Sequence, residues 1–527
     1  MQGARALVEV LVASGVRHVF GLPGDTGMAF YDALRDERGT IDHVMTRDER
    51  SASFMADVYA RVSSRLGVCE GPSGGGATYI IPGVAEAQGS AIPLLCLTSD
   101  TPVDQHGRGV LTELDQETLF QPVTKWNTRV NSAATMAEAT RRAIRMATAG
   151  RPGATHLSLP TDSLEGETPD SSVYGVPELG MAPAMRVVPD QLLVERAAAE
   201  LAAAERPVIV AGGGVLTSGA WDELTSLAET LNIPVATSIN GKGSIAETSN
   251  VAIGVIGGNG ARPYANDCLA EADLVVYVGS RTDSTTTCHW TLPSISNPPG
   301  VIQIDIEPFE VGNNYPLVVG LVGDAKLTLA AMLEAIPRPS AVAERNQPRI
   351  TRLQGERAKY WGNVERQASE HAKPIKPAQV VAAMRNALDD DTIIVADPGT
   401  PTPYLNAQYE LRVAGRTTVI PRAHGGLGYA IPGVVGAWYA GDGRPVVGMT
   451  GDGSFGMSVG ELETITRLGL PIVIIQCSKL EWHVRLDQGT PAPLPRRSVL
   501  RGRFQPRGLR RDRTWFWFSL RPGHRTQ

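Results

Sequence analysis

The 527-residue sequence contains no long hydrophobic run. Its most apolar stretch, GYAIPGVVGAWYA at residues 428–440, is interrupted by Pro432. The stretch is also shorter than the roughly 20 apolar residues that span a bilayer as a helix. The N-terminal residues form no apolar segment followed by a cleavage site, so they do not resemble a signal peptide. We therefore expect no membrane partner and predict a cytoplasmic protein.

Cysteine is scarce, which argues against a fold stapled by disulfides. The chain has five cysteines, and none of them shows the Cys-x-x-Cys spacing of zinc or redox motifs. We expect reduced thiols. An excess of basic residues is also absent, because 49 Lys and Arg face 55 Asp and Glu, for a net charge of −6. The overall charge therefore gives no reason to expect nucleic acid as a partner.

Short apolar runs alternate with helical patterns along most of the chain. Examples are VRHVFGL, IPLLCLTSD, RPVIVAGGG, ADLVVYVGSRTD and TIIVADPGT. Strands that alternate with helices favour a mostly parallel sheet with helices on both faces. Two polar, proline-containing stretches divide the pattern into thirds. We predict an α/β protein of three doubly wound parallel-sheet domains, at residues 1–168, 188–337 and 375–476.

The composition changes abruptly at residue 477. From there to residue 527 the chain holds eleven arginines and three acidic residues, prolines recur, and no helical or strand periodicity continues. We expect this basic tail, 477–527, to be disordered. Two explanations stay open. One is a shift of reading frame near codon 477, in the gene or in its sequence record. The other is a real basic arm, whose RGLRRDRTWFWF segment could mimic a nucleic-acid-binding patch.

The sequence RPVVGMTGDGSF places an apolar strand directly before a glycine-rich turn. Glycines on both sides of Asp452 permit close approach of the backbone to a ligand. Backbone N–H groups in such a turn can bind phosphate oxygens. A carboxylate beside phosphate oxygens suits Mg²⁺, which is held by one or two protein oxygens together with phosphate. Taken alone, Asp-Gly is also a common turn dipeptide, so an ordinary turn is the alternative.

The longer segment GDGSFGMSVGELETITRLGLPIVII resembles the diphosphate-binding motif of thiamine-diphosphate-dependent enzymes, close to the acetolactate synthase group. TRDERSASFMADVYAR, EGPSGGGATYIIPGV, VIQIDIEP and RAHGGLGYAIPGVVGA resemble other segments of that family, in the same order. The resemblance covers about residues 1–476. It implies a pyrimidine-binding domain, a central Rossmann-like domain and a diphosphate-binding domain, the last of which is incomplete.

The resemblance also implies thiamine diphosphate and Mg²⁺ as cofactors, and a 2-oxo acid as substrate. Glu49 would be the catalytic glutamate that hydrogen-bonds the aminopyrimidine ring, although a surface charge is the alternative. Leu427 would support the bent cofactor, and Asp452 would bind the metal. The other residues implied to contact the cofactor are Gly399, Thr400, Gly426, Gly451, Gly453 and Ser454. Decarboxylation followed by carboligation is the expected reaction; a simple decarboxylase or an acetyl-transferring enzyme is the alternative.

Three departures from the family pattern bear on function. Lys479 stands where the family has its second metal ligand, and lysine offers no acceptor, so a catalytically impaired protein is a further alternative. Leu111-Thr112-Glu113 stands where many acetolactate synthases have Phe-Gln-Glu. The segment STTTCHWTL is unlike that of flavin-bound members, so we do not expect FAD. In relatives the active site lies between subunits, which implies a homodimer or homotetramer.

Overall fold

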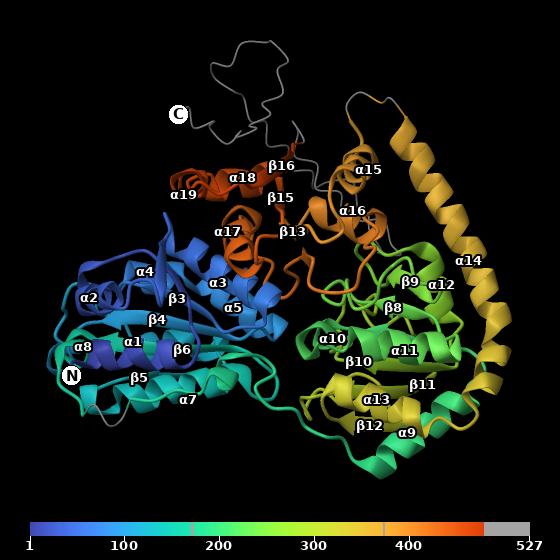
Figure 1. The fold of residues 1–527 in the computed structure, drawn as a ribbon, viewed down its shortest axis with the longest axis horizontal. Helices are drawn as coiled ribbons and strands as arrows, with labels where there is room; N and C mark the ends of the chain where they lie inside the picture. The colour runs from blue at the N-terminus through green and yellow to red at the C-terminus, as the bar shows by residue number, and fades with distance from the viewer. Residues whose placement is uncertain (170–172, 371, 373–374, 479–527) are drawn as a thin grey trace.

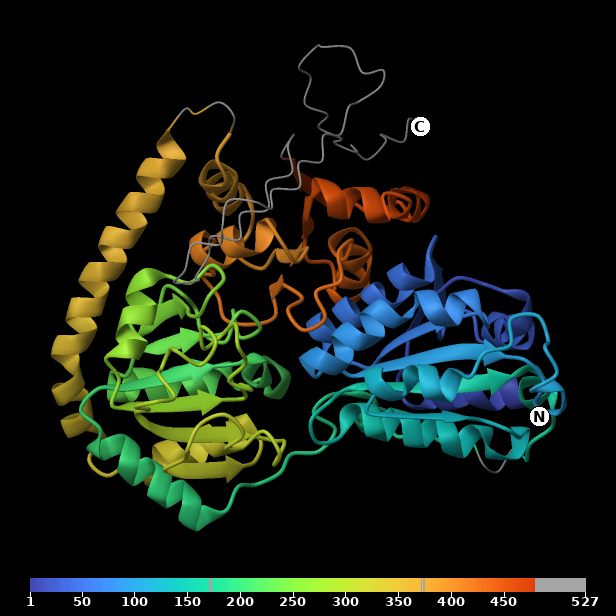
Figure 2. The same ribbon diagram turned by 180° about the vertical axis from the view of Figure 1, so that it is seen from behind.

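The structure is a computed structural model, and it describes residues 1–169, 173–370, 372 and 375–478. Lys479 and the rest of the basic tail therefore lie outside the described residues. The described chain forms three parallel sheets with helices around them, which confirms the predicted α/β class. We call each sheet with its helices a unit. Figures 1 and 2 show the first and central units side by side, with the third unit above both.

The first unit holds a six-stranded sheet in the order β2-β1-β3-β4-β6-β5, and each neighbouring pair is parallel. Every residue of β4 and β6 is buried, as expected for strands covered on both faces. Its strands are β1 (His18–Gly21), β2 (Asp42–Met45), β3 (Gly67–Gly71), β4 (Leu94–Asp100), β5 (Trp126–Arg129) and β6 (Ala154–Pro160). Its helices are α1 (Gly3–Ala13), α2 (Met28–Asp36), α3 (Glu49–Ser63), α4 (Gly75–Tyr79), α5 (Ile81–Ser90), α6 (Gln116–Phe120), α7 (Met136–Thr148) and α8 (Thr161–Glu165).

The central unit holds a second six-stranded parallel sheet, in the order β12-β11-β10-β7-β8-β9. Its strands are β7 (Pro207–Ala211), β8 (Val235–Thr237), β9 (Ala252–Val255), β10 (Leu274–Val278), β11 (Gly300–Asp305) and β12 (Val319–Val322). Its helices are α9 (Gln191–Ala203), α10 (Gly213–Ser218), α11 (Trp221–Leu231), α12 (Pro263–Ala270) and α13 (Ala325–Ala335). The long helix α14 (Pro339–Ser369) then runs along the outer side of this unit and leads to the third (Figure 1).

The third unit holds a four-stranded parallel sheet, in the order β14-β13-β15-β16. Its strands are β13 (Ile393–Ala396), β14 (Thr418–Val419), β15 (Val446–Gly451) and β16 (Val473–Cys477). Its helices are α15 (Pro377–Ala387), α16 (Pro401–Gln408), α17 (Ala430–Ala440), α18 (Asp452–Ser458) and α19 (Glu461–Arg467).

The apolar stretch that ends in α17 lies between the first and third units. One cluster of buried residues contains side chains of α3 and of α17, among them Phe54, Val58, Val434 and Val435. A Cβ at Gly436 would overlap the backbone of Met55, so this glycine permits the two helices to lie close together. A helix that is apolar on all sides is buried. Among the residues that the structure describes, every helix is too short or too polar to cross a membrane.

Candidate active site

Glu49 is the first residue of α3, and it follows the carboxyl end of β2. Asp48 has an extended backbone and caps the helix, because its carboxylate accepts a hydrogen bond of 2.8 Å from the Arg50 N–H. The Glu49 side chain is buried, with 8% of the residue exposed. Burial, together with the nearby Asp48 and Glu70 carboxylates, raises the pKa of Glu49. The carboxyl group is therefore held toward its protonated form, which the sequence pattern alone did not predict.

A glycine-rich turn after β3 faces the Glu49 carboxyl. A Cβ at Gly71 would lie 3.4 Å from Glu49 Cγ, and one at Gly76 would lie 3.1 Å from Glu49 Oε1. A Cβ at Gly74 would lie 2.8 Å from Thr112 Cβ, on the loop where the family pattern departs. Thr112 has a φ of 68°, which is unusual for a β-branched residue. Its hydroxyl lies 2.7 Å from Ser73 Oγ, so the departing loop lies against the same turn as Glu49.

The segment around Glu49 is tied to the third unit of the same chain. The Arg47 N–H donates to Glu461 Oε1 at 2.9 Å, and Arg47 Nε donates to Glu463 Oε2 at 2.6 Å. Arg50 Nη2 donates to the Met457 carbonyl oxygen at 2.7 Å. These contacts place the start of α3 beside α18 and α19, the helices that follow the Asp452 turn.

The Asp452 turn follows the carboxyl end of β15, as the sequence predicted. Asp452 begins α18, and its Oδ1 accepts a hydrogen bond of 2.8 Å from the Gly453 N–H. Ser454 is buried. A Cβ at Gly451 would have no atom within 4 Å, so the space beside the turn is open. The described residues contain no group of three or more His, Cys, Asp or Glu that could hold a metal, so Asp452 would need non-protein oxygens to complete a metal site.

Two further predicted segments meet at this edge of the third sheet. Gly399 follows β13 with a φ of 117°, and open space again surrounds its Cβ position. Thr400 precedes α16 as its N-cap residue. The buried Asp397 carboxylate accepts a hydrogen bond of 2.7 Å from the Tyr429 N–H, which ties the loop around Leu427 to the end of β13.

The loop of Gly426 and Leu427 is fixed from two sides. Ser458 Oγ of α18 donates to the Gly428 carbonyl oxygen at 2.6 Å. A Cβ at Gly426 would lie 3.0 Å from Phe54 of α3. Leu427 itself is 39% exposed and is free to contact a ligand. The structure therefore brings together the segments of Gly399, Leu427 and Asp452, and it packs the helix of Glu49 against the second of them.

Sequence reasoning missed the buried polar groups that hold these segments. Glu86 of α5 accepts hydrogen bonds from the backbone N–H groups of four successive residues, Arg422, Ala423, His424 and Gly425, at 2.7–3.2 Å. Glu70 of β3 directly precedes the glycine-rich turn that faces Glu49, and its carboxyl group contacts Tyr31 and His43. A signal for Glu70 existed, because a glutamate is unusual in an otherwise apolar strand.

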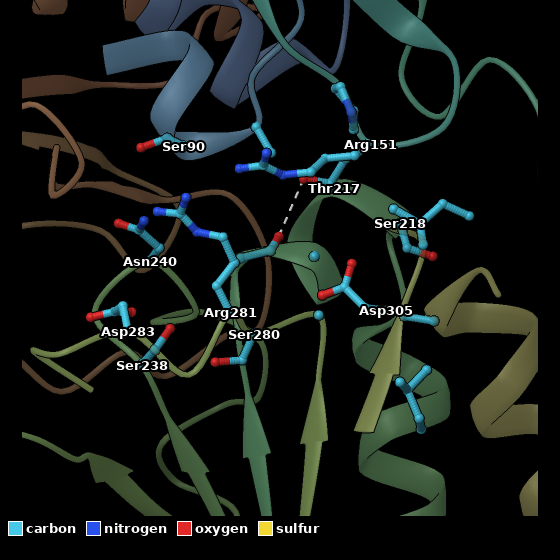
Figure 3. Close-up of a pocket in the computed structure, with 18 of the residues that line it drawn as sticks. Ser90, Arg151, Thr217, Ser218, Ser238, Asn240, Ser280, Arg281, Asp283 and Asp305 are labelled. Carbon is cyan, nitrogen blue, oxygen red and sulfur yellow. Dashed lines mark hydrogen bonds between the residues drawn. The ribbon is translucent and has the colours of Figure 1, made fainter. Parts of the chain in front are cut away.

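A pocket lies away from these segments, at the carboxyl ends of β7, β8, β10, β11 and β12 of the central unit. Figure 3 shows Arg151 of the first unit and Arg281 of the central unit on its wall, with Asp283 and Asp305 nearby. Arg422 of the third unit also lines it. Burial raises the pKa of Asp305 to about 6. Arginine side chains from all three units therefore line a pocket at the edge of the sheet where open α/β folds bind ligands.

Comparisons with known proteins show relatives over about 90% of the chain. Residues 1–119 match the "Thiamine pyrophosphate enzyme, N-terminal TPP binding domain", residues 194–332 match the family's central domain, and residues 397–478 match its "C-terminal TPP binding domain". Thiamine pyrophosphate is another name for thiamine diphosphate.

Two of the three relatives below are named acetolactate synthase, and the third is named for thiamine pyrophosphate. The chain is 35% identical to "Probable acetolactate synthase large subunit" of Methanococcus aeolicus over 487 residues, which cover 90% of this chain and 80% of the relative. It is 31% identical to "Acetolactate synthase isozyme 3 large subunit" of Escherichia coli, over 90% of this chain and 82% of the relative. It is 28% identical to "Putative thiamine pyrophosphate-containing protein YdaP" of Bacillus subtilis, over 89% and 79%.

Proposed function

The chain belongs to the thiamine pyrophosphate enzyme family and is acetolactate synthase-like, and on this premise we propose that it decarboxylates a 2-oxo acid and joins the remaining fragment to a second carbonyl compound. By family it is an enzyme of the carboligase and lyase kind. When bound, the cofactor supplies the electron sink for decarboxylation. The observation that supports the proposal is the meeting of the segments of Gly399, Leu427 and Asp452 at one edge of the third sheet.

The residues at this edge fit a diphosphate and a cation. The Cβ positions of Gly399 and Gly451 have no neighbour within 4 Å, so the backbone at both turns is accessible to phosphate oxygens. We propose that Thr400, Gly453 and Ser454 add contacts to the diphosphate. Asp452 would bind Mg²⁺, whose remaining ligands would be phosphate oxygens and water. Gly426 and Leu427 would lie against the cofactor rings.

Glu49 is proposed to hold and return a proton at the aminopyrimidine ring. Its burial favours the neutral carboxyl, which can donate a hydrogen bond to a ring nitrogen and take the proton back. The side-chain-free turn of Gly71 and Gly76 leaves the carboxyl group open on one side. Efficient general acid–base catalysis needs a pKa near the working pH, and burial moves the pKa of Glu49 in that direction.

Calorimetry of the full chain with thiamine diphosphate, with and without Mg²⁺, tests cofactor binding. We expect Mg²⁺-dependent binding in which Asp452→Asn loses most of the Mg²⁺ dependence. Incubation with a 2-oxo acid, followed by measurement of released CO₂ and mass spectrometry of the product, then tests the reaction. A coupled product supports carboligation, whereas an aldehyde alone would indicate the simple decarboxylase. Failure to bind the cofactor at all would overturn the proposal.

A second copy of the chain is proposed to complete the site. Large apolar side chains are exposed in the first unit, where Met28 is 68%, Tyr79 is 63% and Leu111 is 85% exposed. Apolar side chains of the third unit near Asp452 are also exposed, among them Met457 at 45% and Val459 at 46%. Single exposed apolar side chains are ordinary on a protein surface. The proposal therefore rests chiefly on the resemblance, because in relatives the glutamate of one subunit acts at the diphosphate site of its partner. Sedimentation should therefore give the mass of a dimer or tetramer, and a monomer would contradict this part of the proposal.

We also propose that FAD is not a cofactor, because the segment STTTCHWTL at residues 284–292 is unlike that of flavin-bound members of the family. The charged pocket of Figure 3 lies beside this segment, with Thr285 and Thr286 in its lining. The absorbance spectrum of the purified protein decides the question. We expect no visible flavin band, and a stoichiometric flavin spectrum would show that the prediction is wrong.

A further inference from the structure

The loop that carries Leu427 has two anchors, and one of them belongs to another unit. After Leu427, the third unit holds the loop itself, because the buried Asp397 carboxylate accepts a hydrogen bond of 2.7 Å from the Tyr429 N–H. Before Leu427, the loop is held by Glu86, which lies on α5 of the first unit. The place of Leu427 in the third unit therefore depends on a carboxylate of the first.

The Glu86 carboxylate accepts hydrogen bonds from four successive backbone N–H groups. Those of Arg422 and Ala423 donate to Oε1, and those of Ala423, His424 and Gly425 donate to Oε2, at 2.7–3.2 Å. Gly425 has a φ of 72°, in the left-handed region. Successive N–H groups that turn toward one point form a concave anion-binding site. Here the anion in that site is a side chain of the protein.

The face of α5 around Glu86 has the shape to receive the loop. Gly89 lies three residues after Glu86, on the same side of the helix. A Cβ at Gly89 would lie only 2.6 Å from the Ala423 Cβ, so the absence of a side chain lets the loop approach. The Ser90 hydroxyl, one residue further, donates to Glu86 Oε1 at 2.8 Å. One side of the helix thus supplies the acceptor, the space for the loop and a hydrogen bond that orients the acceptor.

Glu86 is ionised at neutral pH although it is fully buried. Burial raises its pKa, but Arg61 and the hydrogen bonds that Glu86 accepts lower the pKa by more, so the net pKa is depressed. The other charged or titratable groups near it are Asp57 of α3, Tyr429 of the third unit and Arg422 of the loop. An ionised carboxylate accepts hydrogen bonds on both oxygens, as the four N–H groups require.

We propose that Glu86 is a positioning residue for the cofactor site, because its carboxylate fixes the backbone of residues 422–425 and thereby places Leu427. This inference rests on the proposed contact between Leu427 and the cofactor rings. A loop that already has its binding conformation loses less conformational entropy when a ligand binds. Without the anchor, only a fraction of the molecules present Leu427 correctly, and the apparent affinity for the cofactor falls by that fraction.

Two measurements on the full chain test the inference. Hydrogen exchange of the amides of residues 422–425, followed by mass spectrometry without cofactor, reports on the loop. Calorimetry with thiamine diphosphate and Mg²⁺ reports on the cofactor site. In Glu86→Gln we expect these amides to exchange roughly tenfold faster, because they lose hydrogen bonds to a charged group. We expect the cofactor to bind roughly tenfold more weakly in the same variant.

Gly89→Ala is a second variant, which leaves every buried charge in place. Its added methyl group would meet the Ala423 methyl group and displace the loop from α5, whereas alanine favours the helix itself. We expect faster exchange and weaker binding here too, and this variant tests the inference even if Glu86→Gln does not fold. Combining Gly89→Ala with Ala423→Gly removes the clash, so we expect the double variant to restore both values.

Leu201→Ala of α9 is the matched control. It leaves a cavity in the separate core cluster of the central unit and so lowers the free energy of unfolding. We expect its loop exchange and its cofactor affinity to equal those of the parent chain. Unchanged exchange in both Glu86→Gln and Gly89→Ala would overturn the inference. Faster exchange with unchanged cofactor affinity would also overturn it, because Glu86 would then contribute to stability alone.

The inference and the proposed function fail in different ways. If the parent chain binds no thiamine diphosphate, the proposed function is rejected, and the role of Glu86 at a cofactor site is rejected with it. If the parent chain binds the cofactor and the variants bind it equally well, only the role of Glu86 is rejected.

Discussion

Two buried carboxyl groups beside helix α3 differ in their environment: Glu49 at its N-terminal end and Glu86 of α5, which lies beside its C-terminal half. Burial raises the pKa of Asp57 on α3 itself, in spite of Arg61 and Tyr429, so the contrast is between Glu49 and Glu86. Toward the C-terminal end, Asp57 lies 2.8 Å from Arg61, and Arg61 lies 3.1 Å from Glu86. The Tyr429 hydroxyl of the third unit donates to Asp57. At the N-terminal end, the described residues provide no ion-pair partner for Glu49, and the charges that raise its pKa, after burial, are those of Asp48 and Glu70.

This difference separates a structural region from a reactive one. Burial raises the pKa of Glu86. Arg61 and the hydrogen bonds from Ser90, His424 and Gly425 lower it by more than burial raises it, so the net pKa is depressed. The net pKa of Glu49 is raised. A carboxylate whose charge is fully compensated holds its geometry but exchanges no proton near neutral pH. An uncompensated one can do so, and strongly shifted groups of this kind concentrate at functional sites.

The largest effect should come from removing the reactive carboxyl group. Glu49→Gln keeps the shape of the side chain but cannot release a proton. We expect it to lower the rate of 2-oxo acid turnover by roughly 10²–10⁴-fold, the usual contribution of general acid–base catalysis. Steady-state rates of CO₂ release measure this, with Asp36→Asn as an exposed control. Unchanged turnover in Glu49→Gln would remove the basis of the comparison, since Glu49 would then be another structural carboxylate.

Sequence patterns predicted one of these two regions better than the other. The α/β class and the glycine turns at Gly399, Gly426 and Gly451 follow from local features, namely apolar strands that end in residues without side chains. The hydrogen bonds between Glu86 and the loop at 422–425 join residues more than 300 positions apart, so no local sequence pattern predicts them. The roles of the individual site residues and the domain boundaries stay predictions.

The Glu70 cluster shows the same limit in the first unit. A glutamate in an apolar strand is visible in the sequence, but its partners Tyr31 and His43 come from a helix and a strand whose positions only the fold defines. Gly21 of β1 is the register partner of Glu70, and a Cβ there would overlap the Glu70 carboxylate, so the space for this side chain is likewise a property of strand register. The sequence thus shows where a polar residue lies in a core strand, but only the packing of the fold shows which side chains bind it.

The next largest effect should come from the structural region. Glu86→Gln removes one of the two buried carboxylates that pair with Arg61, and it turns an amide toward the backbone N–H donors of residues 422–425. Removing one member of a buried ion pair costs about 3–5 kcal/mol. We therefore expect a loss of this size in the free energy of unfolding, measured with denaturant.

Glu138→Gln is the control for this loss, because it removes an exposed ion pair with Arg142 that contributes about 0–1 kcal/mol. The effect of Glu86 also depends on pH. Because its pKa is depressed in the folded chain, its contribution is present above the usual carboxyl pKa and is lost as the pH falls through that range. Equal stability of the two variants would contradict the contrast between Glu49 and Glu86.

A smaller effect is expected at Lys479, which lies outside the described residues and stands where the family has its second metal ligand. Lys479→Asn removes a positive charge and adds an acceptor. We expect the Mg²⁺-dependent binding of thiamine diphosphate to tighten by about tenfold, or about 1.4 kcal/mol. Calorimetry measures this, and Lys359→Asn on α14 is the exposed control. No gain over the control would show that Lys479 does not impair the site, and it would favour a real C-terminus over a shifted reading frame.

The smallest effect sharpens the comparison through stability alone. The pKa of Glu49 is raised in the folded chain, so the folded state binds a proton that the unfolded state has released. Stability therefore falls as the pH rises from the usual carboxyl pKa through the raised one, the opposite of Glu86. Glu49→Gln removes this loss, so at neutral pH its free energy of unfolding should exceed that of the parent chain. We expect this gain to be smaller than the loss in Glu86→Gln. Denaturant unfolding at acidic and neutral pH measures both variants. A parent chain whose advantage over Glu49→Gln grows with pH would show that Glu49 is stabilised as an anion, like Glu86, and that the two carboxyl groups do not differ.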